Sequence, residues 1–173
     1  MAGPRMRVSA SVLGAPDPQA LGAFYAQLLG WTVVQSHPVW VMVRPPDGGT
    51  GLSFQHEPDY VAPVWPAGPG DQQMMTHLDI AVEDLAAGVA WAVESGATLA
   101  AFQPQEHVRV LLDPAGHRFQ RIALADLGDP GCGVWEVRPR LGLIGMLMGW
   151  WQIKLSSGCP LARGHRLAVA RRS

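Results

Sequence analysis

The chain has 173 residues, of which 48% are hydrophobic and 16% are charged, so it can bury a core and is not a disordered chain. At about 150 residues per domain, this length predicts one domain with an appendage. The formal net charge of −1 and the absence of a clustered basic stripe argue against a nucleic-acid partner. The longest apolar run, residues 141–151, is too short to span a bilayer.

Charge and cysteine content divide the chain near residue 124. Residues 1–124 are acidic overall and contain no cysteine, so they have no disulfide framework and no thiolate nucleophile. Residues 125–173 are basic overall and contain both Cys132 and Cys159. Because the N-terminus also lacks a signal-peptide pattern, we expect a cytoplasmic protein. The extension at residues 125–173 is atypical, and it is expected either to be poorly ordered or to dock on the body or on a partner.

The first part of the chain predicts a strand, a helix and three further strands. An apolar segment at residues 10–16 runs into Asp17, a natural helix N-cap followed by Pro18 at the first helical position. Apolar residues then recur at helical spacing until Gly30, which stands where a C-terminal glycine belongs. Two strands and a Gly-rich turn follow, and the turn leads into a last strand.

The same order of elements is expected again after a Pro- and Gly-rich linker at residues 57–73. A strand runs into Asp84, which caps a second predicted helix that ends before Gly96. Strands at residues 97–101 and 108–112 and a second turn complete the unit. Asp17 and Asp84 are 67 residues apart, which indicates an internal duplication.

Each unit has one helix and therefore covers only one face of its sheet. The two modules, about residues 6–56 and about residues 74–124, must bury apolar surface against each other or in a partner chain. The predicted fold is α+β, with two tandem βαβββ modules that form a curved mixed sheet of eight strands around a concave pocket, with the helices outside. Concave faces between duplicated halves are good sites for small molecules.

The alternation along residues 77–82 places two functional groups together. The apolar residues at positions 78, 80 and 82 should pack under the helix, which leaves His77 and Asp79 on the concave side. A carboxylate this close to a histidine can perturb its protonation. The pair is therefore a candidate for general acid–base catalysis without a metal ion. The alternative is that Asp79 only orients His77.

Two motifs carry a family resemblance, namely H-x-x-x-x-x-x-D at residues 77–84 and D-P-x-G-H at residues 113–117. With the repeated layout, they make residues 6–124 resemble the vicinal oxygen chelate superfamily, and more narrowly the glyoxalase/bleomycin-resistance-like proteins. The resemblance is specific for the fold. It is weak for function, because members include lyases, isomerases, dioxygenases, antibiotic-modifying enzymes and pure binders.

In metal-using members, as the resemblance implies, each module supplies one ligand from its first strand and one from its last. These positions hold Ala10 and His77 on the first strands, and Ser53 and Gln120 on the last strands. A shift of one residue pair would replace Ser53 by Gln55. One imidazole, neutral amides and an alanine suit a transition metal poorly, so no cofactor is expected. A divalent metal at this depleted site is the alternative.

The remaining candidates are expected to contact a ligand. Trp40 offers an aromatic surface, and Ser53, Gln55 and Gln120 offer polar groups near the concave face. Histidines 107 and 117 are expected at the surface, and Trp91 in the core.

The expected function is the binding of a small organic molecule, with metal-independent chemistry centred on His77 and Asp79. One alternative is a metal-dependent lyase or dioxygenase. Another is sequestration of a drug or metabolite without turnover. No nucleic acid or membrane span is expected, and the architecture is compatible with a homodimer.

Overall fold

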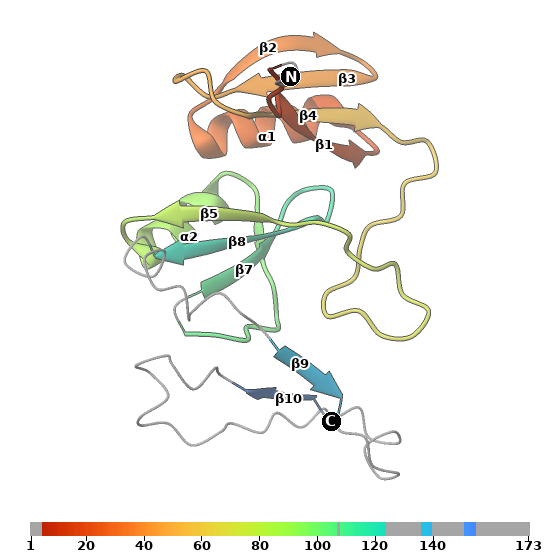
Figure 1. Ribbon diagram of the computed structural model, residues 1–173, viewed down its shortest axis with the longest axis vertical. Helices are drawn as coiled ribbons and strands as arrows, with labels where there is room; N and C mark the ends of the chain where they lie inside the picture. Colours follow the sequence, from red (N-terminus) through yellow and green to blue (C-terminus); the bar gives the residue numbers. More distant parts are fainter. Residues whose placement is uncertain (1–4, 107, 124–135, 140–150, 155–173) are drawn as a thin grey trace. The chain divides into compact units, whose positions relative to one another are not determined.

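A computed structural model describes residues 5–106, 108–123, 136–139 and 151–154 (Figure 1). The chain divides into two compact units, Met1–Ala123 and Leu124–Ser173. In the second unit, strands β9 (Glu136–Pro139) and β10 (Trp151–Lys154) pair antiparallel. The other residues of that unit, on which the expectations of poor order and of docking fall, lie outside the described part of the chain.

The first module of the larger unit has the predicted order of elements. Its bounds are β1 (Ala10–Ala15), α1 (Pro18–Leu29), β2 (Thr32–His37), β3 (Trp40–Arg44) and β4 (Gly51–His56). The strands form a mixed sheet in the order β1-β4-β3-β2, in which the first and last strands of the module lie side by side and run parallel.

The second module repeats this arrangement. Its bounds are β5 (Leu78–Val82), α2 (Leu85–Glu94), β6 (Thr98–Leu99), β7 (Val108–Leu112) and β8 (Arg118–Ala123). The strand order β5-β8-β7-β6 matches that of the first sheet, again with a parallel pairing of the first and last strands. The α+β fold of two tandem βαβββ modules is thus confirmed, whereas the expected single sheet of eight strands is wrong, because the strands hydrogen-bond as two sheets of four.

The helix ends explain why both helices begin where the sequence predicts. The Asp17 carboxylate accepts hydrogen bonds from the backbone N–H groups of Gln19 and Ala20, at 3.0 and 2.9 Å. Asp84 accepts one from Ala87 at 2.9 Å. At the other end of α1, Gly30 has φ 65°, a left-handed conformation that glycine adopts without steric cost. The two aspartates therefore occupy equivalent places in the two modules.

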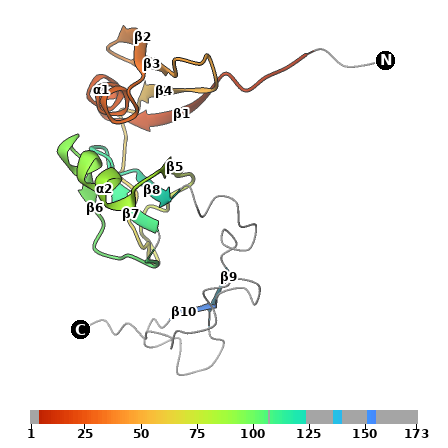
Figure 2. The same cartoon turned by 90° about the vertical axis from the view of Figure 1, so that its left-hand side faces the viewer.

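Helix α1 contributes Leu21, Phe24, Tyr25 and Leu28 to the hydrophobic core. It lies against β3 and β4 of its own sheet, as both views show (Figures 1 and 2). The fully buried ring of Tyr25 stacks on Phe54 of β4, with ring centroids 5.4 Å apart. The core continues into the second module, where the ring centroid of Phe119 on β8 lies 6.1 Å from that of Phe24. One hydrophobic core therefore serves both modules.

Two local expectations were wrong. Trp91 is 42% exposed rather than part of the core, and its indole N–H donates to the Leu28 carbonyl oxygen at 3.1 Å. The strand expected at residues 97–101 is reduced to two residues. Beyond it, the backbone N–H of Ala100 donates to the Val110 carbonyl oxygen at 3.0 Å, and the side-chain amide of Gln103 bonds both the N–H and the C=O of Val110 at 2.9 Å, in the way a neighbouring strand would.

Candidate functional site

The parallel ladders place the two duplicated sets of positions in the same register. In the first sheet Val12 pairs with Ser53, and in the second sheet Asp79 pairs with Gln120. Each pair in the second sheet stands 67 residues after its counterpart in the first. Along β5, Leu78 and Ile80 pack against the core while Asp79 is exposed, as the alternation predicts. The two modules therefore present equivalent faces with different side chains.

On the second sheet, the polar side chains of that face form a connected group. The Gln120 amide nitrogen Nε2 donates a hydrogen bond to Asp79 Oδ1 at 2.6 Å. His77 Nε2 lies 3.4 Å from the same carboxylate oxygen. Arg118 Nη2 points at Gln120 Oε1 at 3.5 Å, which is long for a hydrogen bond. We call these four residues the β5–β8 cluster.

Arg118 is the most deeply buried member of the β5–β8 cluster. It is 9% exposed, and its guanidinium carbon lies 4.0 Å from the ring centroid of Trp65, a residue of the linker between the modules. Its Nε is buried without a hydrogen-bond partner among the described residues, and so is the indole nitrogen of Trp65. Burial lowers the pKa of Arg118, and Asp79 opposes this shift. The guanidinium stays charged at neutral pH.

His77 sits next to this cation and is affected by it. Partial burial lowers the pKa of its imidazole, the positive charge of Arg118 lowers it further, and Asp79 acts in the opposite direction. Because the ordinary histidine pKa of about 6.5 is already below neutrality, His77 is mostly uncharged at pH 7. A neutral imidazole that solvent can reach is able to accept a proton.

The candidates from the first module lie apart from this group in the hydrogen-bond network. Ser53 is 1% exposed and its hydroxyl has no partner in the described part of the chain. The Gln55 amide donates to Glu57 Oε1 at 3.2 Å. Trp40, half-buried on β3, pairs with Gln55 across the sheet. Among residues 5–106 and 108–123, no hydrogen bond or ion pair joins these three to the β5–β8 cluster.

The comparisons with known proteins agree with this layout. The family described as "Glyoxalase-like domain" matches residues 10–122. The chain belongs to this glyoxalase-like family. The resemblance to the vicinal oxygen chelate superfamily is thus confirmed, and residues of both modules lie inside the matched region.

Solved structures share the fold of this glyoxalase-like chain at low sequence identity. A glyoxalase/bleomycin resistance protein/dioxygenase family enzyme from Burkholderia phytofirmans is 20% identical, with TM-score 0.53 over 68% of this chain and 98% of that one. A protein from Agrobacterium tumefaciens, solved by NMR, is 22% identical, with TM-score 0.52 over 69% and 98%. The trypanothione-dependent glyoxalase I of Leishmania major is 17% identical, with TM-score 0.51 over 71% and 90%.

These similarities establish the fold and leave the activity open. No curated protein matches the chain. Within the described residues, no helix has the length and apolar character needed to cross a membrane.

The family implies a metal position on this face, and the residues present fit a metal poorly. Ala10 contributes no donor atom, and the described residues contain no group of three or more His, Cys, Asp or Glu side chains that could hold an ion. The side-chain amide N–H of Gln120 already donates a hydrogen bond to Asp79. The guanidinium of Arg118 lies beside the same groups and would repel a divalent cation.

Sequence reasoning missed two members of this site and misplaced a third residue. Arg118 could have been found, because it stands 67 residues after Gly51 on the equivalent strand. Trp65 gave no signal, since it lies in an irregular linker. The expectation that His117 is a surface residue was wrong: its side chain is 14% exposed and its Nδ1 lies 3.0 Å from Asp113 Oδ2. The second histidine of that expectation, at position 107, lies outside the described residues.

Proposed function

We propose that this glyoxalase-like protein binds a small 2-hydroxy or 2-oxo acid on the exposed face of its second sheet, without a metal ion. The observation that carries the proposal is the juxtaposition of a buried cation, Arg118, with two proton acceptors, Asp79 and His77, on one face. The cation and the acceptors suit different parts of one ligand. Such a ligand has a carboxylate at one end and a hydroxyl or an acidic C–H group beside it.

Arg118 is the group that would bind the carboxylate of such a ligand. No Asp or Glu of the described residues forms a salt bridge with it, and its Nε is buried without a partner. A guanidinium binds a carboxylate through two parallel, charge-assisted hydrogen bonds, and a buried cation gains more from such a bond than an exposed one. The indole of Trp65 covers the guanidinium and offers an apolar surface to the rest of the ligand.

Asp79 and His77 are the groups that would contact the hydroxyl or the acidic C–H group. Their side chains are 49% and 36% exposed, so a ligand can reach both from solvent. The carboxylate of Asp79 has acceptor capacity beyond the one hydrogen bond from Gln120. His77, mostly uncharged at neutral pH, can accept a proton from the ligand.

For a 2-oxo acid we propose one chemical step on this face. The C–H bond next to the carbonyl breaks, the proton moves to the His77 imidazole, and the electron pair forms an enolate. Arg118 stabilises the enolate charge, which is the role that a fixed cation plays in electrostatic catalysis. Asp79, 3.4 Å from the imidazole, stabilises the imidazolium that forms.

Binding is tested by calorimetry on protein treated with a chelator, using mandelate, phenylacetate and mandelamide. Mandelate carries both groups, phenylacetate lacks the hydroxyl, and mandelamide lacks the charge. We expect mandelate to bind best and Arg118→Gln to weaken it at least about tenfold, because a hydrogen bond to a charged group contributes roughly 1.5–3 kcal/mol. The matched control is Arg44→Gln, on the first sheet, which should leave the affinity unchanged.

Proton transfer is tested separately with phenylpyruvate in heavy water. We expect deuterium to enter the carbon next to the carbonyl faster with the wild-type chain than with His77→Gln. Equal affinities for mandelate and mandelamide, or binding that appears only after zinc is added, would contradict the proposal.

A further inference from the structure

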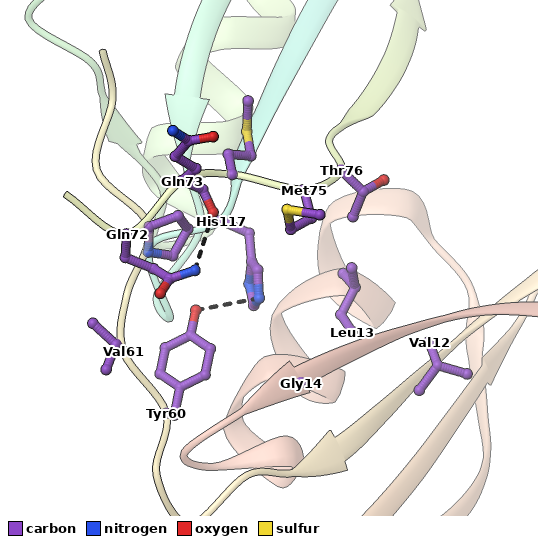
Figure 3. Close-up of a pocket in the computed structure, with 12 residues that line it drawn as sticks. Val12, Leu13, Gly14, Tyr60, Val61, Gln72, Gln73, Met75, Thr76 and His117 are labelled. Carbon is purple, nitrogen blue, oxygen red and sulfur yellow. Dashed lines mark hydrogen bonds between the residues drawn. The ribbon is translucent and has the colours of Figure 1, made fainter. Parts of the chain in front are cut away.

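A cavity elsewhere in the larger unit shares no residue with the β5–β8 cluster. It has a volume of ≈190 Å³, opens to solvent, and is lined by β1, by the linker segments on either side of Trp65 and by His117 (Figure 3). Its apolar wall consists of the following side chains: Val12, Leu13, Val61, Pro63, Met74 and Met75. Three of these are largely exposed although they are apolar, namely Val12 at 51%, Val61 at 64% and Met75 at 90%.

One end of the cavity is polar and internally braced. The Tyr60 hydroxyl donates to the Ala115 carbonyl oxygen at 2.8 Å and lies 3.2 Å from His117 Nε2, as Figure 3 shows for the histidine. His117 Nδ1 is in turn 3.0 Å from the buried Asp113 carboxylate, which also accepts a hydrogen bond from Tyr25. The tyrosine and the histidine are therefore held in fixed positions before any ligand arrives.

The phenol of Tyr60 stays protonated over the whole physiological range. Burial, followed by the negative charge of Asp113, raises its pKa to about 12. Its single O–H hydrogen is donated to the Ala115 carbonyl oxygen, so Tyr60 can accept a hydrogen bond from a ligand, and it does not act as a phenolate nucleophile.

The lining indicates the charge and the size of the occupant. It includes no Asp, Glu, Lys or Arg, and its one imidazole, that of His117, already faces the Asp113 carboxylate, so the lining favours an uncharged occupant. An apolar cavity of about 150 Å³ is large enough to hold benzene. The soft methionine side chains adapt well to an aromatic ring.

We propose that this cavity is a second binding site, for a neutral single-ring aromatic molecule with one hydroxyl group. The ring occupies the apolar wall between β1 and the methionines, and the oxygen faces Tyr60 and His117. This site goes beyond the proposed function, because it selects an uncharged ligand whereas the β5–β8 cluster selects an acid.

The test follows the methyl signals of Met74 and Met75 by NMR while the chain is titrated with benzyl alcohol, toluene and benzoate. We expect benzyl alcohol to bind more tightly than toluene, and benzoate to bind weakest at this site. Tyr60→Phe should weaken benzyl alcohol about two- to tenfold, the range of one hydrogen bond, and leave toluene unchanged. Methionine signals that do not move, or benzoate binding as well as benzyl alcohol, would overturn the proposal.

A matched pair of variants excludes a general effect on the linker. Val61→Trp places an indole in the wall of the cavity and should remove benzyl alcohol binding. Val64→Trp changes a 42% exposed linker residue that does not line the cavity. This variant should bind benzyl alcohol as the wild type does. Equal behaviour of the two variants would contradict the assignment.

The two sites can fail independently. Arg118→Gln should leave benzyl alcohol binding unchanged, and Val61→Trp should leave mandelate binding unchanged. Loss of both ligands from either variant would contradict the claim that the sites are separate.

Discussion

The two modules share one plan and differ in what their side chains do. Helix α1 buries six of its residues, whereas α2 buries only Ala92. On the exposed faces of the first strands, the second module has the polar side chains and the first module has apolar ones. Where the first module has Ala10 and Val12 on its first strand, the second has His77 and Asp79. The comparison indicates that the first copy supplies most of the hydrophobic core and that the second carries the polar side chains of the β5–β8 cluster.

The division depends on contacts that join the copies. Tyr25 of α1 donates its hydroxyl to Asp113 of the second module at 3.0 Å, and both side chains are buried. Burial, helped by the charge of Asp113, raises the pKa of this tyrosine well above its usual range. The second module is therefore joined to the first by a buried hydrogen bond as well as by the shared hydrophobic core.

The largest effect should come from the core of the first module. Phe54→Ala removes a fully buried ring that stacks on Tyr25, so we expect a loss of about 3–5 kcal/mol in the free energy of unfolding. Val93→Ala in α2 changes a side chain that is 49% exposed and should stay within about 0.5 kcal/mol. Urea unfolding measures both. Similar losses for the two variants would remove the contrast in core contribution.

The next effect should distinguish the two turns. Asp113 is 4% exposed, and its carboxylate accepts hydrogen bonds from the backbone N–H groups of Ala115 and His117 as well as from Tyr25. Asp113→Ala leaves these donors without a partner and should cost roughly 3 kcal/mol, since each buried orphan costs about 1–3. Asp47 in the first turn is exposed and bonds only Gly49, so Asp47→Ala should cost less than about 1 kcal/mol. Thermal unfolding of the two variants, compared with wild type, checks the difference.

A smaller and more even effect is expected at the helix caps. Asp17→Ala and Asp84→Ala each remove an N-cap, which typically contributes about 1 kcal/mol. Asp17 holds two backbone N–H groups and Asp84 holds one, so the first variant should lose slightly more. A negligible loss at either position, measured by urea unfolding, would argue against the equivalence of the caps.

The smallest effect is the pH dependence that His77 contributes. Its pKa is lower in the folded chain than in the unfolded chain, so the unfolded state binds a proton more readily. Stability is therefore full above the unfolded value of about 6.5 and declines as pH falls through 6.5 toward the folded pKa. His77→Gln should flatten this part of the stability curve, measured by unfolding between pH 5 and 8. An unchanged slope would show that other groups cause it.

Local sequence patterns were sufficient for most of the fold. Capping residues, turn glycines and alternation depend on neighbours along the chain, so Asp17, Gly30 and the faces of β5 were predictable. Gln103 replaces a strand through its side chain, and nothing in its sequence context predicts that. Three members of the β5–β8 cluster, namely His77, Asp79 and Gln120, were predicted as site residues from the sequence. The contact of Trp65 with Arg118 needs the path of the linker, which carries no periodic signal.

The most direct test of the account is to map mandelate onto the chelator-treated chain by backbone amide NMR. We expect the largest shifts on β5 and β8, around His77 and Arg118, and little change at the equivalent positions of β1 and β4. Shifts concentrated on β1 and β4, or shifts that require added metal, would contradict the claim that the second module holds the chemistry.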